Sequence, residues 1–443
     1  MTGNGYQTMT YPVISLKPSY NPIIRGCPGL PDTLPRIECE LRIRSNDGKP
    51  FFIRNIQTSL KTLECLNTGL GSFASKRTKM DIETVHHKRS MKISDKKLVG
   101  LDIPLTIALP DDIKETNYNS KIGHCYTVLE CDVWYSTKDS SSSQLWQTFS
   151  HIVNVERYVL IASPQLYPPI SKTITSPDRK FRVQLTINNP CVTTDDLLSL
   201  NLTLYPEAAS HGQKQGIFNK QVKIKSISLE LRELLELYDA NSDVRENVLQ
   251  SVSKVYNEPI PESGFKVKLN LRVLTKNPLL HIYETSLNEP AVMYQLPSHP
   301  PQLEQVRPPE TVILKGKHIK EPFQYNSSIT TRGKLFSVIH SIMIKFKISK
   351  GKDFEVSYPI DVSPWPKTHL NHLEQLIYQE REIAKNARAF YQNYGGIRRN
   401  KNGQLEYPPL PSVIYLPTKE SLTQLGVLYN TDSKVPRRMF LIE

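Results

Sequence analysis

Residues 151–190 read HIVNVERYVLIASPQLYPPISKTITSPDRKFRVQLTINNP, and this stretch decides how the rest of the chain is interpreted. An alternating apolar–polar pattern ends at Ala162, and a second one begins at Phe181. Prolines and serines separate the two patterns, which is typical of a connection between strands. Strand-like blocks of similar size lie on either side. We therefore predict that this stretch is the waist between two β-rich halves.

Length and composition fit two domains with additional segments. A chain of 443 residues exceeds what one hydrophobic core usually holds. Its 33 prolines outnumber its 19 glycines and cluster between strand-like runs, which favours a loop-rich all-β protein. No run of about 18 apolar residues occurs, and the N-terminus lacks the charged and apolar regions of a signal peptide. We expect a cytoplasmic protein.

The cysteines and the net charge exclude little by themselves. The six cysteines form no C-x-x-C pair, so we interpret them as core thiols in a reducing compartment. They are Cys27, Cys39, Cys65, Cys125, Cys131 and Cys191. A formal charge of +13 admits nucleic acid, anionic lipid or an acidic partner. Because neither RNP strands nor a helix-turn-helix is visible, we expect no nucleic-acid partner.

Catalytic and cofactor motifs receive no support from the sequence. We find no Gly-rich phosphate loop, no H-E-x-x-H and no paired carboxylates at a useful spacing. A Cys-His-Asp set could be assembled in many ways, and nothing favours one of them. His86 and His87 are adjacent and would point to opposite sides of an extended chain, which argues against a shared metal. We therefore expect a protein that is not an enzyme and that carries neither a cofactor nor a metal.

Period-two patterns place strands through both halves, which we assign to 1–163 and 172–366. The first half has strands near 12–20, 37–43, 51–63, 101–110, 123–135 and 145–159, with a polar, basic loop over 66–99. The second half has strands near 181–188, 197–204, 221–237, 265–273, 334–348 and 353–362. Asp243–Tyr256 is predicted to be a short helix capped by Ser242.

One strand of each half reads like a copy of the other. Ile53–Leu60 reads IRNIQTSL, and Ile224–Leu231 reads IKSISLEL. In both segments the order of residues is apolar, basic, small polar, isoleucine, polar, two further residues, and leucine. Each also follows a strand and a turn-rich link, so the match predicts that the two halves are related sandwiches.

The character of the chain changes beyond Trp365. Asn371–Tyr394 carries an apolar stripe at helical spacing, with Asn371 and Glu374 resembling a capping box and Gly395 and Gly396 ending the helix. We predict a C-terminal helical segment over 367–396 that packs against the second sandwich. Residues 397–443 are basic and contain proline, and we predict an extended or weakly ordered tail.

The ordered series of blocks resembles the arrestin fold, and most closely the fungal arrestin-related trafficking adaptors, or α-arrestins. The matching pieces of the first half are IIRGCPGLP, FFIRNIQTSL, LDIPLTIALPDD, YTVLECDVWY and VERYVL. Those of the second half are KFRVQLTINNP, VKIKSISLEL, FSVIHSIMIKFKI and FEVSYPIDV. The resemblance covers roughly residues 12–365. It implies two immunoglobulin-like β-sandwiches in tandem.

The resemblance also implies a function. Such proteins recognise integral membrane transporters or receptors and recruit a WW-domain HECT-type ubiquitin ligase to them, which causes endocytosis. We therefore expect a non-enzymatic adaptor that is cytoplasmic and peripherally associated with the plasma membrane or endosomes. The alternative is an arrestin-like structural subunit of a vesicle-trafficking coat or exchange complex.

The adaptor function needs a docking motif for the ligase, which is usually Pro-Pro-x-Tyr. The sequence has no intact copy, and the best replacement is a polyproline-type segment. It comprises Tyr407, Pro408, Pro409, Leu410 and Pro411, with Tyr415 further along. The alternative is a rigid tail segment that packs on the protein's own surface.

Two further sets of residues are candidates for binding. The basic residues of the 66–99 loop would meet anionic lipid or an acidic or phosphorylated cargo tail, or would form a solvated loop. They are Lys76, Arg77, Lys79, Lys88, Arg89, Lys92, Lys96 and Lys97. Arg157, at the waist, loosely matches in position the polar-core arginine of animal arrestins, which is held between carboxylates and senses phosphate. The simpler interpretation, which we prefer, is an arginine on a strand face.

Overall fold

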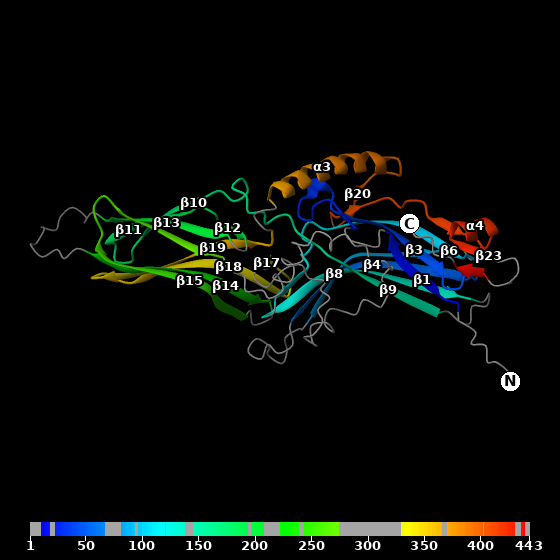
Figure 1. Ribbon diagram of the computed structural model, residues 1–443, viewed down its shortest axis with the longest axis horizontal. Helices are drawn as coiled ribbons and strands as arrows, with labels where there is room; N and C mark the ends of the chain where they lie inside the picture. The colour runs from blue at the N-terminus through cyan, green and yellow to red at the C-terminus, as the bar shows by residue number, and fades with distance from the viewer. Residues whose placement is uncertain are drawn as a thin grey trace, which may run out of the picture.

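The computed structural model consists of two β-sandwiches joined end to end, with one long helix and a C-terminal segment lying on the first (Figure 1). It describes residues 10–17, 23–66, 81–93, 96–119, 121–137, 145–193, 196–207, 222–238, 243–273, 329–365, 370–401, 403–429 and 436–438. The predicted fold class, all-β with tandem sandwiches and a C-terminal helix, is confirmed.

The first sandwich is formed by the strands that precede the waist, together with β22 from the C-terminal segment. One sheet has the order β1-β3-β6-β22, with β2 beside β3, and the other has the order β5-β4-β8-β7, with β9 beside β8. The bounds are β1 Pro12–Lys17, β2 Ile24–Arg25, β3 Arg36–Ser45, β4 Phe52–Leu66, β5 Asp81–Lys92, β6 Gly100–Ala108, β7 Asn117–Asn119, β8 Gly123–Ser136, β9 Leu145–Val153 and β22 Val413–Tyr415.

The second sandwich repeats this arrangement after the waist. One sheet has the order β10-β11-β13-β16, and the other has the order β12-β19-β18-β14-β15, with β17 beside β18. The bounds are β10 Ile170–Thr175, β11 Phe181–Ile187, β12 Cys191–Thr193, β13 Leu197–Pro206, β14 Lys223–Leu237, β15 Asp243–Pro259, β16 Phe265–Arg272, β17 Thr331–Arg332, β18 Phe336–Ser349 and β19 Phe354–Ser363.

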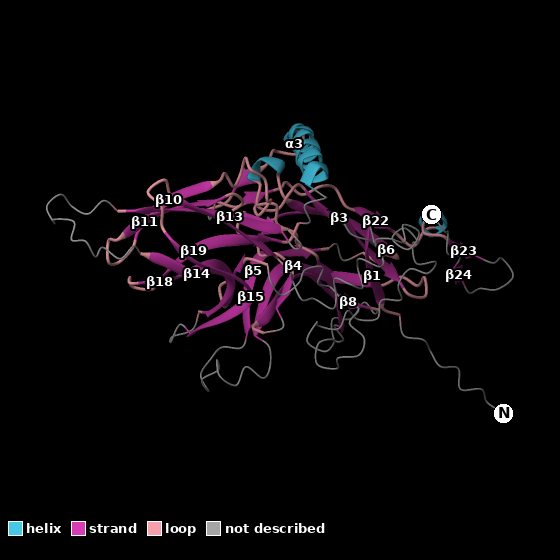
Figure 2. Ribbon diagram, turned by 60° about the vertical axis from the view of Figure 1, so that its left-hand side comes forward, coloured by secondary structure: helices cyan, strands magenta, loops and turns pink. Residues whose placement is uncertain are grey.

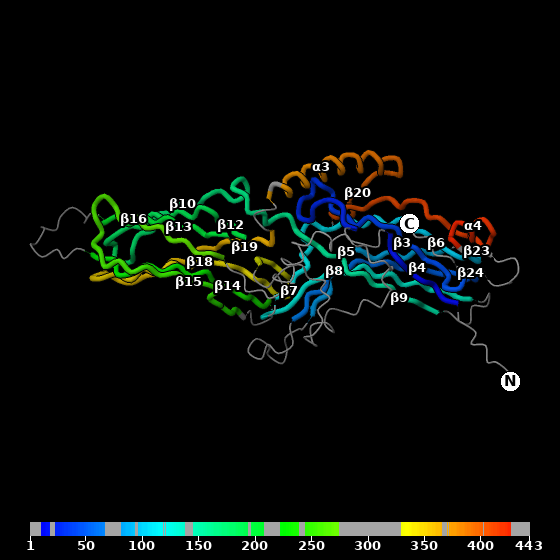
Figure 3. The backbone as a smooth tube through the Cα atoms, in the orientation of Figure 1, coloured from blue at the N-terminus to red at the C-terminus, as the bar shows by residue number. Residues whose placement is uncertain are grey.

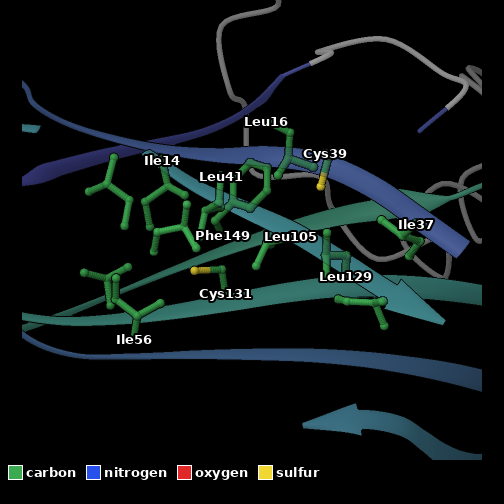
Figure 4. Close-up of a cluster of buried hydrophobic side chains, with 14 of the residues drawn as sticks. Ile14, Leu16, Ile37, Cys39, Leu41, Ile56, Leu105, Leu129, Cys131 and Phe149 are labelled. Atoms are coloured by element: carbon green, nitrogen blue, oxygen red, sulfur yellow. The ribbon is translucent and has the colours of Figure 1, made fainter. Parts of the chain in front are cut away.

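Alternating apolar residues on facing sheets make the core of each sandwich. In the first, Ile14 and Leu41 come from one sheet and Ile56 and Leu129 from the other, and all four are buried. Figure 4 shows these side chains meeting between the two layers of strands. Side chains of a strand point to alternate faces, so one face of each sheet is apolar and is held against its partner sheet.

The predicted repeat is confirmed by two irregularities at matched positions. On β4 the pairing with β8 shifts between Ile53 and Asn55, and on β14 the pairing with β18 shifts between Ile224 and Ser226. A second shift separates Leu60 from Lys61 against β5, and Leu231 from Arg232 against β15. β-Bulges bend a strand and re-aim its side chains, so their coincidence shows that β4-β5 and β14-β15 have the same build.

The ends of β4 and β14 also make the joint between the sandwiches. The buried carboxylate of Glu64, on β4, accepts hydrogen bonds from the backbone N–H of Lys334 (2.8 Å) and of Leu335 (2.9 Å) in the second sandwich. Conversely, the fully buried Glu233 on β14 receives Lys121 of the first sandwich at 3.1 Å. Apolar contacts of Ile122 with Leu235, Leu237, Phe336 and Val338 surround these bonds.

Helix α3, Leu370–Gln392, lies on the first sandwich, so the prediction that it packs against the second is wrong. Its buried stripe contacts the turn around helix η1, Pro31–Thr33. Gly26 donates its backbone N–H to Glu380 (2.8 Å), and the hydroxyls of Thr106 and Tyr391 lie 2.8 Å apart. Trp365 packs on Tyr158 and donates its indole N–H to the carbonyl of Arg157, which directs the chain towards the first sandwich.

The segment after α3 returns along the first sandwich, as the orange-to-red path in Figure 3 shows. The hairpin β20-β21 (Arg398–Arg399 and Leu405–Glu406) follows the helix, and β22 then pairs with β6 in antiparallel orientation. Helix α4, Lys419–Gln424, and the hairpin of β23 (Val427–Tyr429) and β24 (Pro436–Arg438) complete it. In this part the predicted tail is ordered, because a free sheet edge takes up its backbone hydrogen bonds.

Two further predictions of secondary structure are wrong. Asp243–Tyr256 lies in strand β15, and Asp81–Lys92, expected within a loop, is strand β5; Figure 2 shows both among the strands. Valines spaced four apart fit a helix, but an even spacing also fits one face of a strand, and β-branched side chains favour strands. Pairing with β14 decides between the two for β15, and pairing with β4 does so for β5.

Candidate partner-binding groove

A groove of about 960 Å³ opens along one side of the first sandwich, where its two sheets end in β5 and β6. Val85–Lys88 of β5 form one wall, and Ile107 and Ala108 of β6 lie opposite. Its floor includes the buried Leu34 and Leu109. In the described part of the chain β5 pairs only with β4, so its other edge faces the groove with no strand beside it. Such an edge presents backbone donors and acceptors.

The segment that follows the second sandwich builds the far wall of the groove. Arg388 and Gln392, in the last turns of α3, line it together with residues of the β20-β21 hairpin and its approach: Ile397, Arg399, Asn400, Gly403, Gln404, Leu405 and Glu406. The wall is anchored by Ala384, Ala387 and Tyr391, which pack on Leu34. Since the wall comes from residues far along the chain, no local pattern in the first half could have indicated the groove.

In the second sandwich β15 and β16 contact each other away from the positions that match the groove. The rings of Tyr256, on β15, and Phe265, on β16, meet edge to face with centroids 5.2 Å apart. Lys254 also reaches across and donates to the carbonyl of Lys268 (2.9 Å). Val85 of β5 and Val248 of β15 occupy matched positions beside their bulges and are both exposed, and Val85 lines the groove.

Charges are distributed unevenly around the groove. Lys88 and Arg388 line it without an ion pair among the described residues, while Asp111, Asp112 and Glu406 lie elsewhere on its wall. Burial lowers the pKa of His86 and of His87, so both imidazoles are neutral near pH 7. His86 is the bulged residue of β5, and its Nε2 lies 2.7 Å from the Thr62 hydroxyl.

The structure places the predicted basic residues in different surroundings. Lys88, Arg89 and Lys92 are exposed on β5, and Lys96 follows in the next turn. Lys97 lies over the ring of Phe52, 5.5 Å from its centroid. Lys76, Arg77 and Lys79 lie outside the described residues. Of the set, only Lys88 lines the groove.

The proline segment is held on the protein's own surface. Tyr407 packs edge to face on Tyr391 at 4.9 Å, and Leu410 joins the same apolar cluster. Tyr415, in β22, pairs with Gly100 and donates its hydroxyl to Asp102 (2.9 Å). This is the arrangement expected from the alternative interpretation. Pro408, Pro409 and Pro411 connect the two anchored tyrosines without contributing to that cluster.

Arg157 is not on a strand, so that expectation is wrong: β9 ends at Val153, and Arg157 lies in the connection beyond it. One of its terminal nitrogens donates to the carbonyl of Asp111 (3.0 Å). The side chain lines a cavity of about 280 Å³ at the waist, shared with Arg332 and Asp361. The cavity holds charges of both signs, and burial raises the pKa of Asp361.

Neither metal chemistry nor a membrane span is indicated by the geometry. The described residues contain no group of three or more His, Cys, Asp or Glu side chains placed to hold a metal ion. Likewise, in the described part of the chain, no helix combines the length and apolar character needed to cross a membrane.

One relative places this architecture in a family. A Saccharomyces cerevisiae protein named RHO1 GEF localizing protein 1 is 37% identical over 497 aligned residues, covering 98% of this chain and 100% of that protein. This chain belongs to the same family. No protein-family model matches it. The relative's name does not establish an arrestin relationship. It shows that this all-β chain belongs to a family with a member named for localizing a GEF.

The comparison corrects the predicted function. An adaptor that brings a ubiquitin ligase to membrane cargo for endocytosis is wrong, because the relative is named for localizing a GEF, a guanine-nucleotide exchange factor. The alternative, a structural subunit of an exchange complex, agrees better with that name. The groove was missed altogether; the alternation over Asp81–Lys92, which the basic residues obscured, could have indicated the strand β5 but not the groove.

Proposed function

We propose that this protein is a non-enzymatic platform that binds a guanine-nucleotide exchange factor of a Rho-type GTPase and holds it at its place of action in the cytoplasm. The observation that carries the proposal is the full-length similarity to a protein named for localizing a RHO1 GEF. An alignment that spans both chains covers both sandwiches, α3 and the tail, so the whole platform is shared rather than one module.

The joint between the sandwiches supports a platform role. Glu64 and Glu233 each place a buried carboxylate from one sandwich against donors of the other. Breaking such bonds would leave a buried charge unpaired, which costs about 3–5 kcal/mol. The two sandwiches therefore present their surfaces in a fixed relation, as a protein that positions another one requires.

The cysteines support a non-enzymatic role. Burial raises the pKa of Cys27, Cys39 and Cys191 to about 12, and it raises the pKa of Cys125 and Cys131 further. A thiol acts as a nucleophile in its thiolate form, so these five are poorly suited to covalent catalysis. Paired sandwiches with an internal repeat are also what the resemblance to arrestins implies, and we include an arrestin-like ancestry in the proposal.

Co-purification and imaging test the proposal together. We expect the tagged full-length chain to co-purify with a Rho-type exchange factor, identified by mass spectrometry. In cells that lack this chain, that exchange factor, fused to a fluorescent protein, should lose its localized signal while its abundance stays unchanged.

The control is a second membrane-recruited protein of the same cells, whose localization should be unaffected. Purification of the chain without any exchange factor, together with normal localization of every Rho-type exchange factor in its absence, would refute the proposal. A stoichiometric complex with vesicle-coat subunits instead would assign the chain to trafficking.

A further inference from the structure

The groove of the first sandwich has the properties of a site for an extended polypeptide. Its β5 wall is a strand edge with no neighbouring strand among the described residues, and backbone N–H and C=O groups at such an edge bind another strand. Leu34 and Leu109 form a small apolar part of a lining that is otherwise mostly polar. Alternate side chains of an added strand would face this lining and the solvent in turn.

The charges on and beside β5 indicate which polypeptide would fit. Lys88, Arg89 and Lys92 follow one another along the exposed half of the strand, and Arg388 also lines the groove. Asp111, Asp112 and Glu406 line it as well, so carboxylates of a bound segment are expected beside the four cations and not along the whole groove. None of these four is in an ion pair with a carboxylate in the described part of the chain. A segment carrying acidic side chains would pair with them on docking, and such pairs raise both specificity and association rate.

The far wall of the opening is built from its own structural elements. The two sandwiches share bulges at matched positions, and Val248, which matches Val85, is likewise exposed. In the first sandwich the wall opposite β5 is supplied by α3 and the β20-β21 hairpin. Those elements are themselves anchored on Leu34 and Thr106, which keeps the groove at a fixed width.

We propose that this groove binds an extended, acidic segment of the exchange factor, which adds as a strand to the free edge of β5 beside Val85–Lys88. The inference rests on the proposed function and deepens it, because it names the surface and the chemistry of the bound segment. Lys88 and Arg388 pair with carboxylates of that segment, and Leu34 and Leu109 offer it a small apolar contact.

The repeat supplies a matched control for every substitution. Val85, 49% exposed, corresponds to Val248, 55% exposed, and Lys88 corresponds to Ser251 on the other edge strand. A photo-crosslinking amino acid is placed at Val85 or at Val248 of the full-length chain. With the purified exchange factor, we expect a cross-linked product from position 85 and none from position 248.

Charge reversal gives the second readout. Lys88→Glu combined with Arg388→Glu should weaken binding of the exchange factor by about ten-fold or more, whereas Ser251→Glu should leave it unchanged. Both side chains of the double variant are exposed, so unchanged thermal unfolding would confirm that it folds. Binding of the unmodified chain and of the double variant to vesicles containing phosphatidylserine is measured in parallel.

The outcomes separate the inference from the proposed function. If the unmodified chain does not bind the exchange factor, both fail. If it binds, but cross-linking occurs at 248, or within the chain itself, or the double variant binds equally well, the groove inference is overturned and the proposed function stands. Loss of vesicle binding alone in the double variant would overturn it too, and would make β5 a membrane surface.

Discussion

The two sandwiches share a frame and differ at one edge. Both pair a bulged long strand, β4 or β14, with an edge strand that carries the compensating extra residue, His86 or Leu249. In the second sandwich Leu249 packs on the core, and an aromatic contact joins β15 to β16 further along the strand. In the first, His86 is held by Thr62, and the side opens into the groove.

This difference shows how a duplicated frame acquires a surface of its own. The residues that join β15 to β16 lie within the second sandwich, whereas the groove wall of the first comes from α3 and the hairpin after it. One copy thus remains a self-contained sandwich, and the other carries the C-terminal segment. A site made in this way needs the whole chain, because the wall follows both sandwiches in sequence.

The largest effect is expected from truncating matched core leucines. Leu60→Ala and Leu231→Ala remove fully buried side chains at equivalent places of the repeat, and each should lower the free energy of unfolding by about 2–5 kcal/mol. Chemical denaturation followed by hydrogen exchange would measure both. Because the joint is bonded through Glu64 and Glu233, each variant should also reduce protection in the other sandwich.

The surface variant Ser251→Ala serves as the control, since it should change the free energy of unfolding by less than about 0.5 kcal/mol. Loss of protection confined to the mutated sandwich would contradict the fixed joint. A cost far smaller for one leucine than for the other would contradict the equivalence of the two cores.

Alternation and the repeat were enough to predict the two sandwiches, because each strand that packs in a core must carry apolar residues with period two. The match of Ile53–Leu60 with Ile224–Leu231 was therefore informative. The placement of α3 was not predictable in this way. Its stripe of Leu373, Ile377 and Ala384 shows that one face is buried but does not say against what.

The groove escaped prediction for a related physical reason. Its walls come from β5 and from residues near 388–406, and only the tertiary fold brings these together. Charged side chains on β5 also concealed a strand, since an edge strand with two exposed faces has little apolar alternation. Edge strands and docking sites are thus the parts of this fold that are hardest to predict from the sequence pattern.

Acid should destabilise both sandwiches, and the pH range over which stability is lost should differ between them. Burial lowers the pKa of His124, on β8, to about 4 and that of His340, on β18, to about 3. Unfolding returns an imidazole to a pKa near 6.5, so protons favour the unfolded chain below that value. Stability is full above about pH 6.5, and each histidine costs about 1.4 kcal/mol per pH unit as the pH falls towards its own folded pKa.

Unfolding at a series of pH values between about 4 and 7 measures this slope. His340→Gln keeps a polar group beside the Thr330 hydroxyl, 3.0 Å from the histidine Nδ1, and should flatten the slope by one histidine's share. Ser251→Ala, an exposed change that alters no titrating group, provides the control, since it should leave the slope unchanged. A slope unaltered by His340→Gln would show that burial does not lower the pKa of this side chain.

The smallest effect concerns the strand that the first sandwich has gained and the second lacks in its described part. Tyr415→Phe removes the hydroxyl that donates to Asp102, and it should destabilise the local pairing of β22 with β6 by about 1 kcal/mol. Arg44 keeps its ion pair with Asp102 at 2.6 Å, so the global free energy of unfolding should change little.

Hydrogen exchange over 411–417 measures the local opening of β22, and Val413→Ala, at an exposed position of the same strand, is the control. Exchange in the Phe variant that matches the control would mean that backbone pairing alone holds β22. Faster exchange throughout the first sandwich would mean that the tail strand stabilises the whole frame, and the two sandwiches would then differ in stability as well as in surface.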